Sequence, residues 1–119
     1  TLVVGHHPHV AQGLATFGRT LVAYSLGNCV FGGNTDPRDY DAYVLGVTLR
    51  FTDGIAERLD ATAWPIRVSG AKRNNDYQPM LLTGDAAERV FRKILASSGA
   101  NAAPITMGDG ALQAGLDLR

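Results

Sequence analysis

The chain has 119 residues, which suits one domain able to bury roughly two-thirds of the surface of its unfolded state. Hydrophobic residues make up 45% of the chain and charged residues 18%, as in ordinary globular proteins. The 11 basic and 11 acidic residues cancel, so the net charge provides no attraction to nucleic acid or to an anionic membrane surface.

The first residues indicate how the chain relates to a domain. Thr1–Val4 is typical of the inside of a buried strand, and neither an initiator methionine nor a charged leader precedes it. Chain ends usually fray, so a strand flush with a true N-terminus is uncommon. We therefore expect residues 1–119 to form a single unit that is a piece of a longer protein, with the N-terminal half absent. The single cysteine, Cys29, cannot form an internal disulfide.

The N-terminal third alternates short apolar runs with glycines. Leu2–Gly5 predicts a short buried strand, and Thr20–Leu26, rich in β-branched and aromatic residues, predicts a second. Val10–Thr16 is compatible with a helical turn, although Gly13 weakens that prediction. After the break at Gly27-Asn28, residues 29–31 favour a short continuation of the strand, followed by a polar loop up to Asp41.

The middle of the chain predicts a long hairpin. The odd positions of residues 43–52 are all apolar, which indicates a strand with one face on a core. Asp53-Gly54 suits a two-residue type I′ turn, and Ile55–Thr62 returns as the partner strand. Residues 63–68 extend the sheet, with Pro65 indicating an edge or a break. The apolar face consists of Tyr43, Leu45, Val47, Leu49 and Phe51.

The C-terminal part follows a polar loop over residues 69–78. Asp85 and Glu88 form a capping-box pattern that predicts the start of a helix, which Gly99 ends. The tail from Ile105 to Leu118 predicts a second hairpin, around Gly108-Asp109-Gly110. The pattern is one strand-rich α+β unit with a single well-marked helix. The predicted apolar stripe of that helix consists of Ala87, Val90, Phe91, Ile94 and Leu95.

All three histidines of the chain, His6, His7 and His9, lie within four residues. Pro8 biases His7 toward extended geometry, and residues i and i+2 of an extended segment point the same way. His7 and His9 can therefore approach one point, as half of a site for Zn, Mn or Fe, while Gly5 permits close approach of the backbone. The alternative is a surface loop whose histidines bind nothing. Ser25 and Cys29 are weaker candidates, as nucleophiles, because no activating pattern surrounds them.

Two stretches carry a resemblance to a known family. The sequences VVGHHPHVAQG and LVAYSLGNCVFGGN resemble the capsule-synthesis proteins of the CapA type, which are associated with bacterial poly-γ-glutamate. The match is dense over Leu2–Gly33 and looser afterward, where Tyr77-Gln78-Pro79 and the predicted helix fit the C-terminal end of the family. Cys29 stands where the family usually has phenylalanine, which we interpret as a packing change.

The resemblance implies a fold and a metal site. CapA-type proteins look like relatives of calcineurin-type metallophosphoesterases, so the chain would be the strand-rich C-terminal part of a layered αββα fold. The glycine-histidine-x-histidine motif of that superfamily supplies metal ligands, and it falls on His7 and His9, or on His6 with His9. Tyr24, Ser25 and Asn28 match the second motif and would line the same pocket as substrate-binding residues.

The resemblance also implies what lies outside the chain. A site for two divalent ions (Mn, Zn or Fe) needs carboxylates that the superfamily supplies from its N-terminal half, so the chain alone is expected to be inactive. The whole protein would be a metal-dependent phosphoester hydrolase-like enzyme, or an altered relative, serving synthesis, export or anchoring of a cell-surface polymer. The alternative is a non-catalytic polymer-binding or assembly module that keeps the histidines as a remnant.

The expected partners follow from the same resemblance. They are an anionic polymer or a phosphoester substrate, the N-terminal half of the same protein, and other capsule-synthesis membrane proteins, with no nucleic acid. The implied location is the extracytoplasmic side of the bacterial cell envelope, and an upstream membrane anchor is compatible with it.

Overall fold

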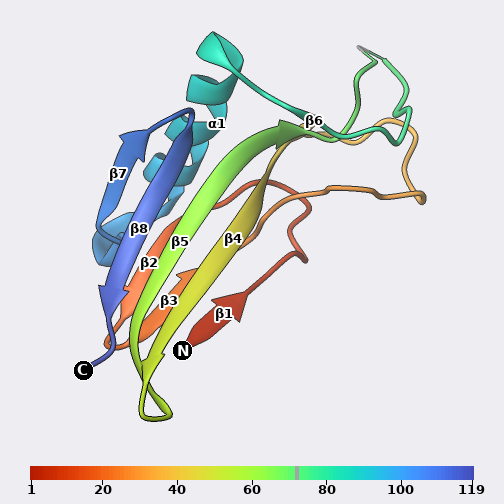
Figure 1. Cartoon of the computed structure of the whole chain (residues 1–119). Coiled ribbons are helices and arrows are strands. Elements are labelled where there is room, and N and C mark those ends of the chain that lie inside the picture. The colour runs from red at the N-terminus through yellow and green to blue at the C-terminus, as the bar shows by residue number, and fades with distance from the viewer. Residues whose placement is uncertain (72) are drawn as a thin grey trace.

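The computed structural model describes residues 1–71 and 73–119, which form two sheets and one α-helix (Figure 1). The described part of the chain is thus a strand-rich α+β unit, as the sequence predicts. No helix among these residues is long and apolar enough to cross a membrane. The elements are β1 (Leu2–Val4), β2 (Leu14–Phe17), β3 (Thr20–Ala23), β4 (Asp41–Thr52), β5 (Ile55–Arg67), β6 (Met80–Leu81), α1 (Gly84–Ser97), a 3₁₀ turn (Gly99–Asn101), β7 (Ile105–Gly108) and β8 (Ala111–Asp117).

The smaller sheet has the strand order β1-β3-β2. β1 runs parallel to β3, and β2 pairs with β3 as an antiparallel hairpin. The turn of this hairpin is Gly18-Arg19, with a positive φ of 57° at Gly18, as a type II′ turn requires of its first residue. The prediction of a helical turn over residues 10–16 is therefore wrong, because Leu14 onward is recruited into a hairpin by the glycine that follows it.

The larger sheet has the order β4-β5-β8-β7, and the short β6 pairs with the end of β5. Its two hairpins confirm the predicted ones. Asp53 and Gly54 both have positive φ, at 50° and 80°, and Asp109 and Gly110 repeat this at 49° and 72°. Both pairs have the backbone that type I′ turns need, which matches the right-handed twist of the flanking strands.

Pro65 lies inside β5 without breaking it. It stands opposite Tyr43, whose N–H donates to the carbonyl of Leu26 on the far side, at 3.0 Å. The Tyr43–Pro65 pair consequently exchanges no ladder bond, so the missing N–H of proline removes no hydrogen bond between β4 and β5. The pairing of β5 with β8 ends at Ala63, so Pro65 lies where that neighbour has already stopped.

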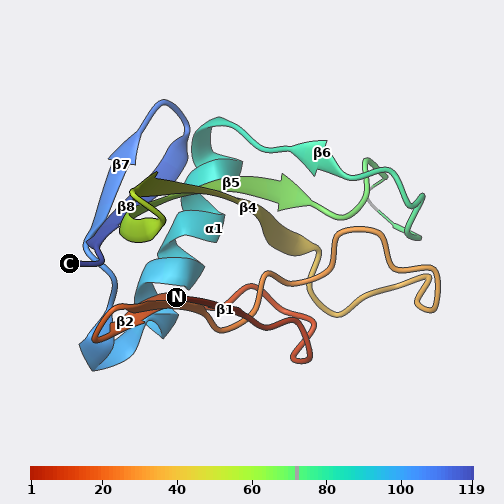
Figure 2. The same cartoon turned by 60° about the horizontal axis from the view of Figure 1, so that its bottom comes forward.

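One core joins both sheets and the helix. α1 contacts β4 and β5 of the larger sheet and β2 of the smaller one, and Figure 2 shows it running from one layer to the other. The predicted stripe is buried except for Leu95, which is 46% exposed. The prediction of a capping box at Asp85 and Glu88 is wrong, because the N-cap residue is Thr83 and its side chain makes no capping hydrogen bond. The buried core consists of Ala11, Leu14, Leu21, Ala23, Tyr43, Leu59, Ala61, Ala63, Ala87, Val90, Phe91, Ile94, Ala103, Leu112, Ala114 and Leu118.

The apolar face of β4 covers this core only in its first half. Tyr43 is buried, whereas Leu49 and Phe51 are 45% and 58% exposed. These two residues lie toward the Asp53-Gly54 turn, where the hairpin extends beyond the helix (Figure 1). The alternation of the sequence therefore identifies the correct face of the strand but overestimates how much of its length is covered.

The core makes a prediction about stability. Ile94→Ala should lower the free energy of unfolding by about 2–5 kcal/mol, because Ile94 is fully buried and its truncation leaves a cavity. Leu49→Ala is the matched control and should cost less than about 1 kcal/mol, because its side chain is half exposed. Urea denaturation of both variants measures the difference, and a larger loss for Leu49→Ala would contradict the assigned core.

Candidate functional site

The histidines follow β1 in a tight turn. The N–H of His9 donates to the carbonyl of His6 at 3.0 Å, and His9 adopts a positive φ of 59°. A non-glycine residue in this left-handed region is uncommon and marks a site where local structure imposes the conformation. The segment therefore turns at Pro8 instead of continuing as the extended strand that would have pointed His7 and His9 the same way.

The second motif lies directly beside this turn. Gly5 N–H donates to the carbonyl of Ala23 at 2.9 Å, and Leu26 N–H donates to the carbonyl of Gly5 at 3.1 Å. A Cβ on Gly5 would lie 2.3 Å from the carbonyl oxygen of Tyr24. The glycine therefore permits close approach to the neighbouring strand of the same chain, rather than to a bound group.

Asn28 and His9 are in direct contact, as the sequence predicts for residues of one pocket. Asn28 Oδ1 lies 2.7 Å from His9 Nδ1, and Asn28 Nδ2 lies 3.4 Å from the backbone oxygen of His9. The ring of Phe31 lies 4.9 Å from that of His9, centroid to centroid. Gly27, with a φ of 78°, turns the chain after Leu26 and so directs Asn28 toward the histidine.

These contacts border a hollow of about 230 Å³. Of the three histidines, His9 lines the hollow and His6 and His7 do not. The ring centroid of His7 lies 6.4 Å from that of His9. The loops that surround it meet at the end of the molecule where β4 begins and β5 ends (Figure 1). The hollow is lined by Pro8, His9, Val10, Asn28, Phe31, Asn34, Pro37, Arg38 and Asp39.

The other predicted residues lie outside the lining of this hollow. Tyr24 is 38% exposed. Ser25 is fully buried, and its hydroxyl accepts the backbone N–H of Gly27 at 3.2 Å, which is a structural contact. Cys29 is exposed and lies in an irregular segment, so the prediction that residues 29–31 continue the strand is wrong.

Comparison with known proteins finds similarity over this part of the chain. Residues 1–33 match the family described as "Bacterial capsule synthesis protein PGA_cap". A segment of 39 residues is 49% identical to "PGA biosynthesis protein CapA" of Bacillus subtilis (strain 168), covering 32% of this chain and 10% of that relative. The histidine turn and the Tyr24–Asn28 segment both lie in the matched region. Residues 1–33 are therefore similar to proteins of the CapA type, and we call them the CapA-type segment.

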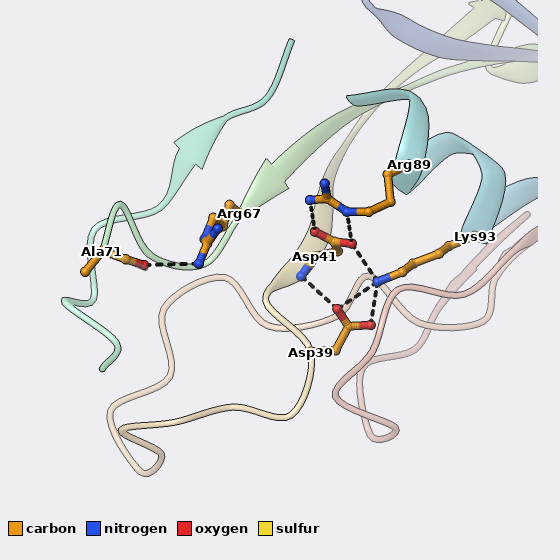
Figure 3. A network of polar contacts seen from close by, with 6 residues as sticks. All are labelled: Asp39, Asp41, Arg67, Ala71, Arg89 and Lys93. Atoms are coloured by element: carbon orange, nitrogen blue, oxygen red, sulfur yellow. Dashed lines mark hydrogen bonds and ion pairs between the residues drawn. The ribbon is translucent and has the colours of Figure 1, made fainter. Parts of the chain in front are cut away.

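A network of charged side chains beside the hollow joins the start of β4 to α1. Asp39, which lines the hollow, accepts from Lys93 Nζ at 2.8 and 2.9 Å and from the backbone N–H of Asp41 at 3.0 Å. Asp41 accepts a bidentate pair from Arg89, with Nη2 at 2.7 Å and Nε at 2.9 Å, and a further bond from Lys93 at 2.6 Å (Figure 3). This network fixes the start of β4 against α1.

Sequence reasoning missed this network. Arg89 and Lys93 are separated by one helical turn and share a face of α1, and Asp39 and Asp41 alternate along an extended segment. Each spacing is visible in the sequence, but the pairing joins residues 48 to 54 positions apart. Burial by itself raises the pKa of the Asp41 carboxyl, but the hydrogen bonds from Arg89 and Lys93 outweigh it and hold the pKa below its usual value.

The donors of the hollow fit a metal only in part. Histidines that bind metals commonly have the other ring nitrogen hydrogen-bonded to an oxygen, and His9 Nδ1 has such a contact with the amide oxygen of Asn28. Among residues 1–71 and 73–119, however, no three histidine, cysteine, aspartate or glutamate side chains lie close enough together to hold an ion. The described residues therefore do not form a complete metal site by themselves.

The close approach at Gly5 makes a testable prediction. Gly5→Ala should lower the free energy of unfolding by about 1–3 kcal/mol, because the new methyl group would meet a backbone oxygen that cannot move independently. Gly32→Ala is the matched control, since no atom lies within 4 Å of a Cβ at that position. Chemical denaturation measures both, and equal stability of the two variants would contradict the assigned contact.

The Asp41 network predicts a pH dependence. Asp41→Asn should lower the free energy of unfolding by about 1–3 kcal/mol at pH 7, because it weakens hydrogen bonds between charged groups. The pKa of Asp41 is lower in the folded state, so its contribution is present above about pH 4 and is lost as the pH falls through the folded-state pKa. Urea denaturation at several pH values should show the difference from wild type shrinking in acid.

The control for this prediction is Asp117→Asn, which weakens an exposed pair with Arg58 and should cost less than about 1 kcal/mol at any pH. A constant difference between wild type and Asp41→Asn down to pH 2 would show that Asp41 does not titrate with folding.

Proposed function

We propose that this chain is part of a CapA-type protein that acts in the synthesis, export or anchoring of a cell-surface polymer of the poly-γ-glutamate capsule type. One observation carries the proposal: the two stretches that define the resemblance meet at one hollow, where His9 of the first is bonded to Asn28 of the second. The two residues are 19 positions apart and would lie up to roughly 65 Å from each other in a fully extended chain, so it is the fold that brings them into contact.

We further propose that the histidine turn is one wall of a metallophosphoesterase-like site. His9, together with His7 or His6, would be a ligand, and a divalent metal bound there would polarise a phosphoester and lower the pKa of a bound water. The carboxylate ligands would come from the N-terminal half of the same protein. In this view the two sheets and α1 are part of the layered αββα fold, and the site faces an anionic polymer or a phosphoester on the extracytoplasmic side of the envelope.

A second candidate is a non-catalytic module that binds polymer or assembles with other capsule proteins. It is favoured by the single histidine in the hollow, since a metal-dependent hydrolase would be expected to bring at least two imidazoles to one point. Arg38 lines the same hollow and provides a positive charge suited to an anionic ligand.

The test uses the full-length protein that contains this chain. After supply of Mn²⁺, Zn²⁺ or Fe²⁺, wild type should retain metal, measured by mass spectrometry, and hydrolyse a generic aryl phosphodiester. His9→Ala should reduce metal content at least about tenfold and abolish hydrolysis, because one ligand is lost. Thr35→Ala, at an exposed loop position, is the control and should match wild type. If the wild-type protein retains no metal and hydrolyses no phosphodiester, the proposed metal site is contradicted and the non-catalytic binding module remains.

A further inference from the structure

The two contacts of the Asn28 side chain determine which way its amide lies. The backbone oxygen of His9, 3.4 Å from one end of the amide, can only accept a hydrogen bond. The atom that faces it must therefore be the amino nitrogen Nδ2. The amide oxygen Oδ1 consequently faces the His9 ring, at 2.7 Å from Nδ1. The hydrogen-bond network thus fixes the orientation of the Asn28 amide, whose oxygen and nitrogen would otherwise be hard to tell apart.

This orientation has a consequence for the histidine. An amide oxygen carries no hydrogen, so the hydrogen of the bond must be on Nδ1 of His9. We infer that Asn28 is a positioning residue for His9: its amide holds the neutral imidazole in the Nδ1–H tautomer, so that Nε2 carries the lone pair. Sequence reasoning places Asn28 in contact with substrate, whereas this inference has it act through the histidine.

The surroundings hold this arrangement in place. Asn28 is 8% exposed, so water has little access to compete for its amide. Phe31 packs against the His9 ring at an angle of 46°. The backbone of His9 is bonded at both ends, through its N–H to His6 and through its oxygen to Asn28. Ring and backbone are thus constrained together, and His9 itself stays exposed at the hollow.

A fixed neutral nitrogen with a free lone pair binds an electron-pair acceptor. Such acceptors are a divalent cation or the acidic hydrogen of a bound ligand. The choice of a cation rests on the proposed function, whereas the tautomer does not, because it follows from protein contacts alone. The two can therefore be tested separately.

The decisive measurement is the tautomer of each histidine in metal-free protein. Long-range ¹H–¹⁵N spectra of the ¹⁵N-labelled chain distinguish Nδ1–H from Nε2–H, at about pH 8.5 where imidazoles are neutral. His9 should be predominantly Nδ1–H. His6 and His7 serve as internal references, since among the described residues neither ring has a side-chain hydrogen bond.

Three variants connect the tautomer to Asn28. Asn28→Ala should shift His9 to the tautomer mixture of the reference histidines, and Asn28→Asp should retain Nδ1–H because a carboxylate still accepts that hydrogen. Asn34→Ala is the matched control: Asn34 lines the same hollow but bonds to Asp36 and Asn75, and His9 should be unchanged. A wild-type His9 that is mainly Nε2–H, or one unaltered by Asn28→Ala, overturns the inference. The wild-type result decides even if Asn28→Ala does not fold.

Calorimetric titration of the full-length protein with Zn²⁺ separates the inference from the proposed function. Asn28→Ala should bind Zn²⁺ about 10- to 100-fold more weakly than wild type, and Asn28→Asp should recover most of the affinity. Wild type that shows the expected tautomer but binds no Zn²⁺ contradicts the metal proposal and leaves the positioning role intact. Equal affinity of Asn28→Ala and wild type, with a changed tautomer, overturns the role of Asn28 in metal binding.

Discussion

A short chain of backbone hydrogen bonds centred on Leu26 holds the two sheets and the candidate site together. Leu26 donates its N–H to Gly5, after the first strand, and accepts the N–H of Tyr43 in β4. The same residue forms an isolated antiparallel bridge with Ala11. Gly5 makes the first of these contacts possible, because any side chain would collide with the carbonyl of Tyr24. The histidine turn and the Asn28 segment lie on either side of this junction, so their contact depends on it.

The extent to which the sequence predicts this fold depends on how local each cause is. Asp53-Gly54 and the Asp109-Gly110 pair both specify tight turns through their own backbone preferences, and both hairpins are predicted correctly. For the stretch from Val10 to Thr16 the determinant lies outside the stretch. β2 begins only at Leu14, and the Gly18-Arg19 turn that follows it brings β2 against β3. The start of α1 is also predicted wrongly, because the capping-box pattern of Asp85 and Glu88 is present in the sequence but the helix begins at Gly84, with Thr83 as its N-cap.

In the candidate site, too, the features with a local cause are predictable from the sequence and the others are not. The proximity of Asn28 and His9 is predictable, because a glycine break follows a strand that lies beside the histidines. The turn at Pro8 is not predictable, because the residue before a proline favours extended geometry. In the structure the hydrogen bond from the N–H of His9 to the carbonyl of His6 closes a turn instead. The Asp41–Arg89–Lys93 network joins a loop to a helix across about 50 residues, a separation that no motif spans. Spacing identifies the faces on which these charges lie, but only the fold pairs them.

The strained backbone of His9 lies at the candidate site and depends on the stability of the rest of the fold. Positive φ at a non-glycine residue costs about 1–3 kcal/mol and persists only where the surroundings impose it. At His9 two hydrogen bonds do so, and one of them comes from the same amide that holds the ring. A single side chain thus supports both the unfavourable backbone and the orientation of the imidazole. The core beneath is formed by different residues, those of α1 and the inner faces of the strands, so it supplies the stability that lets an exposed histidine keep a strained conformation. The candidate site can therefore be built from a short stretch, because the fold has only to place two segments side by side and Asn28 then orients the His9 ring.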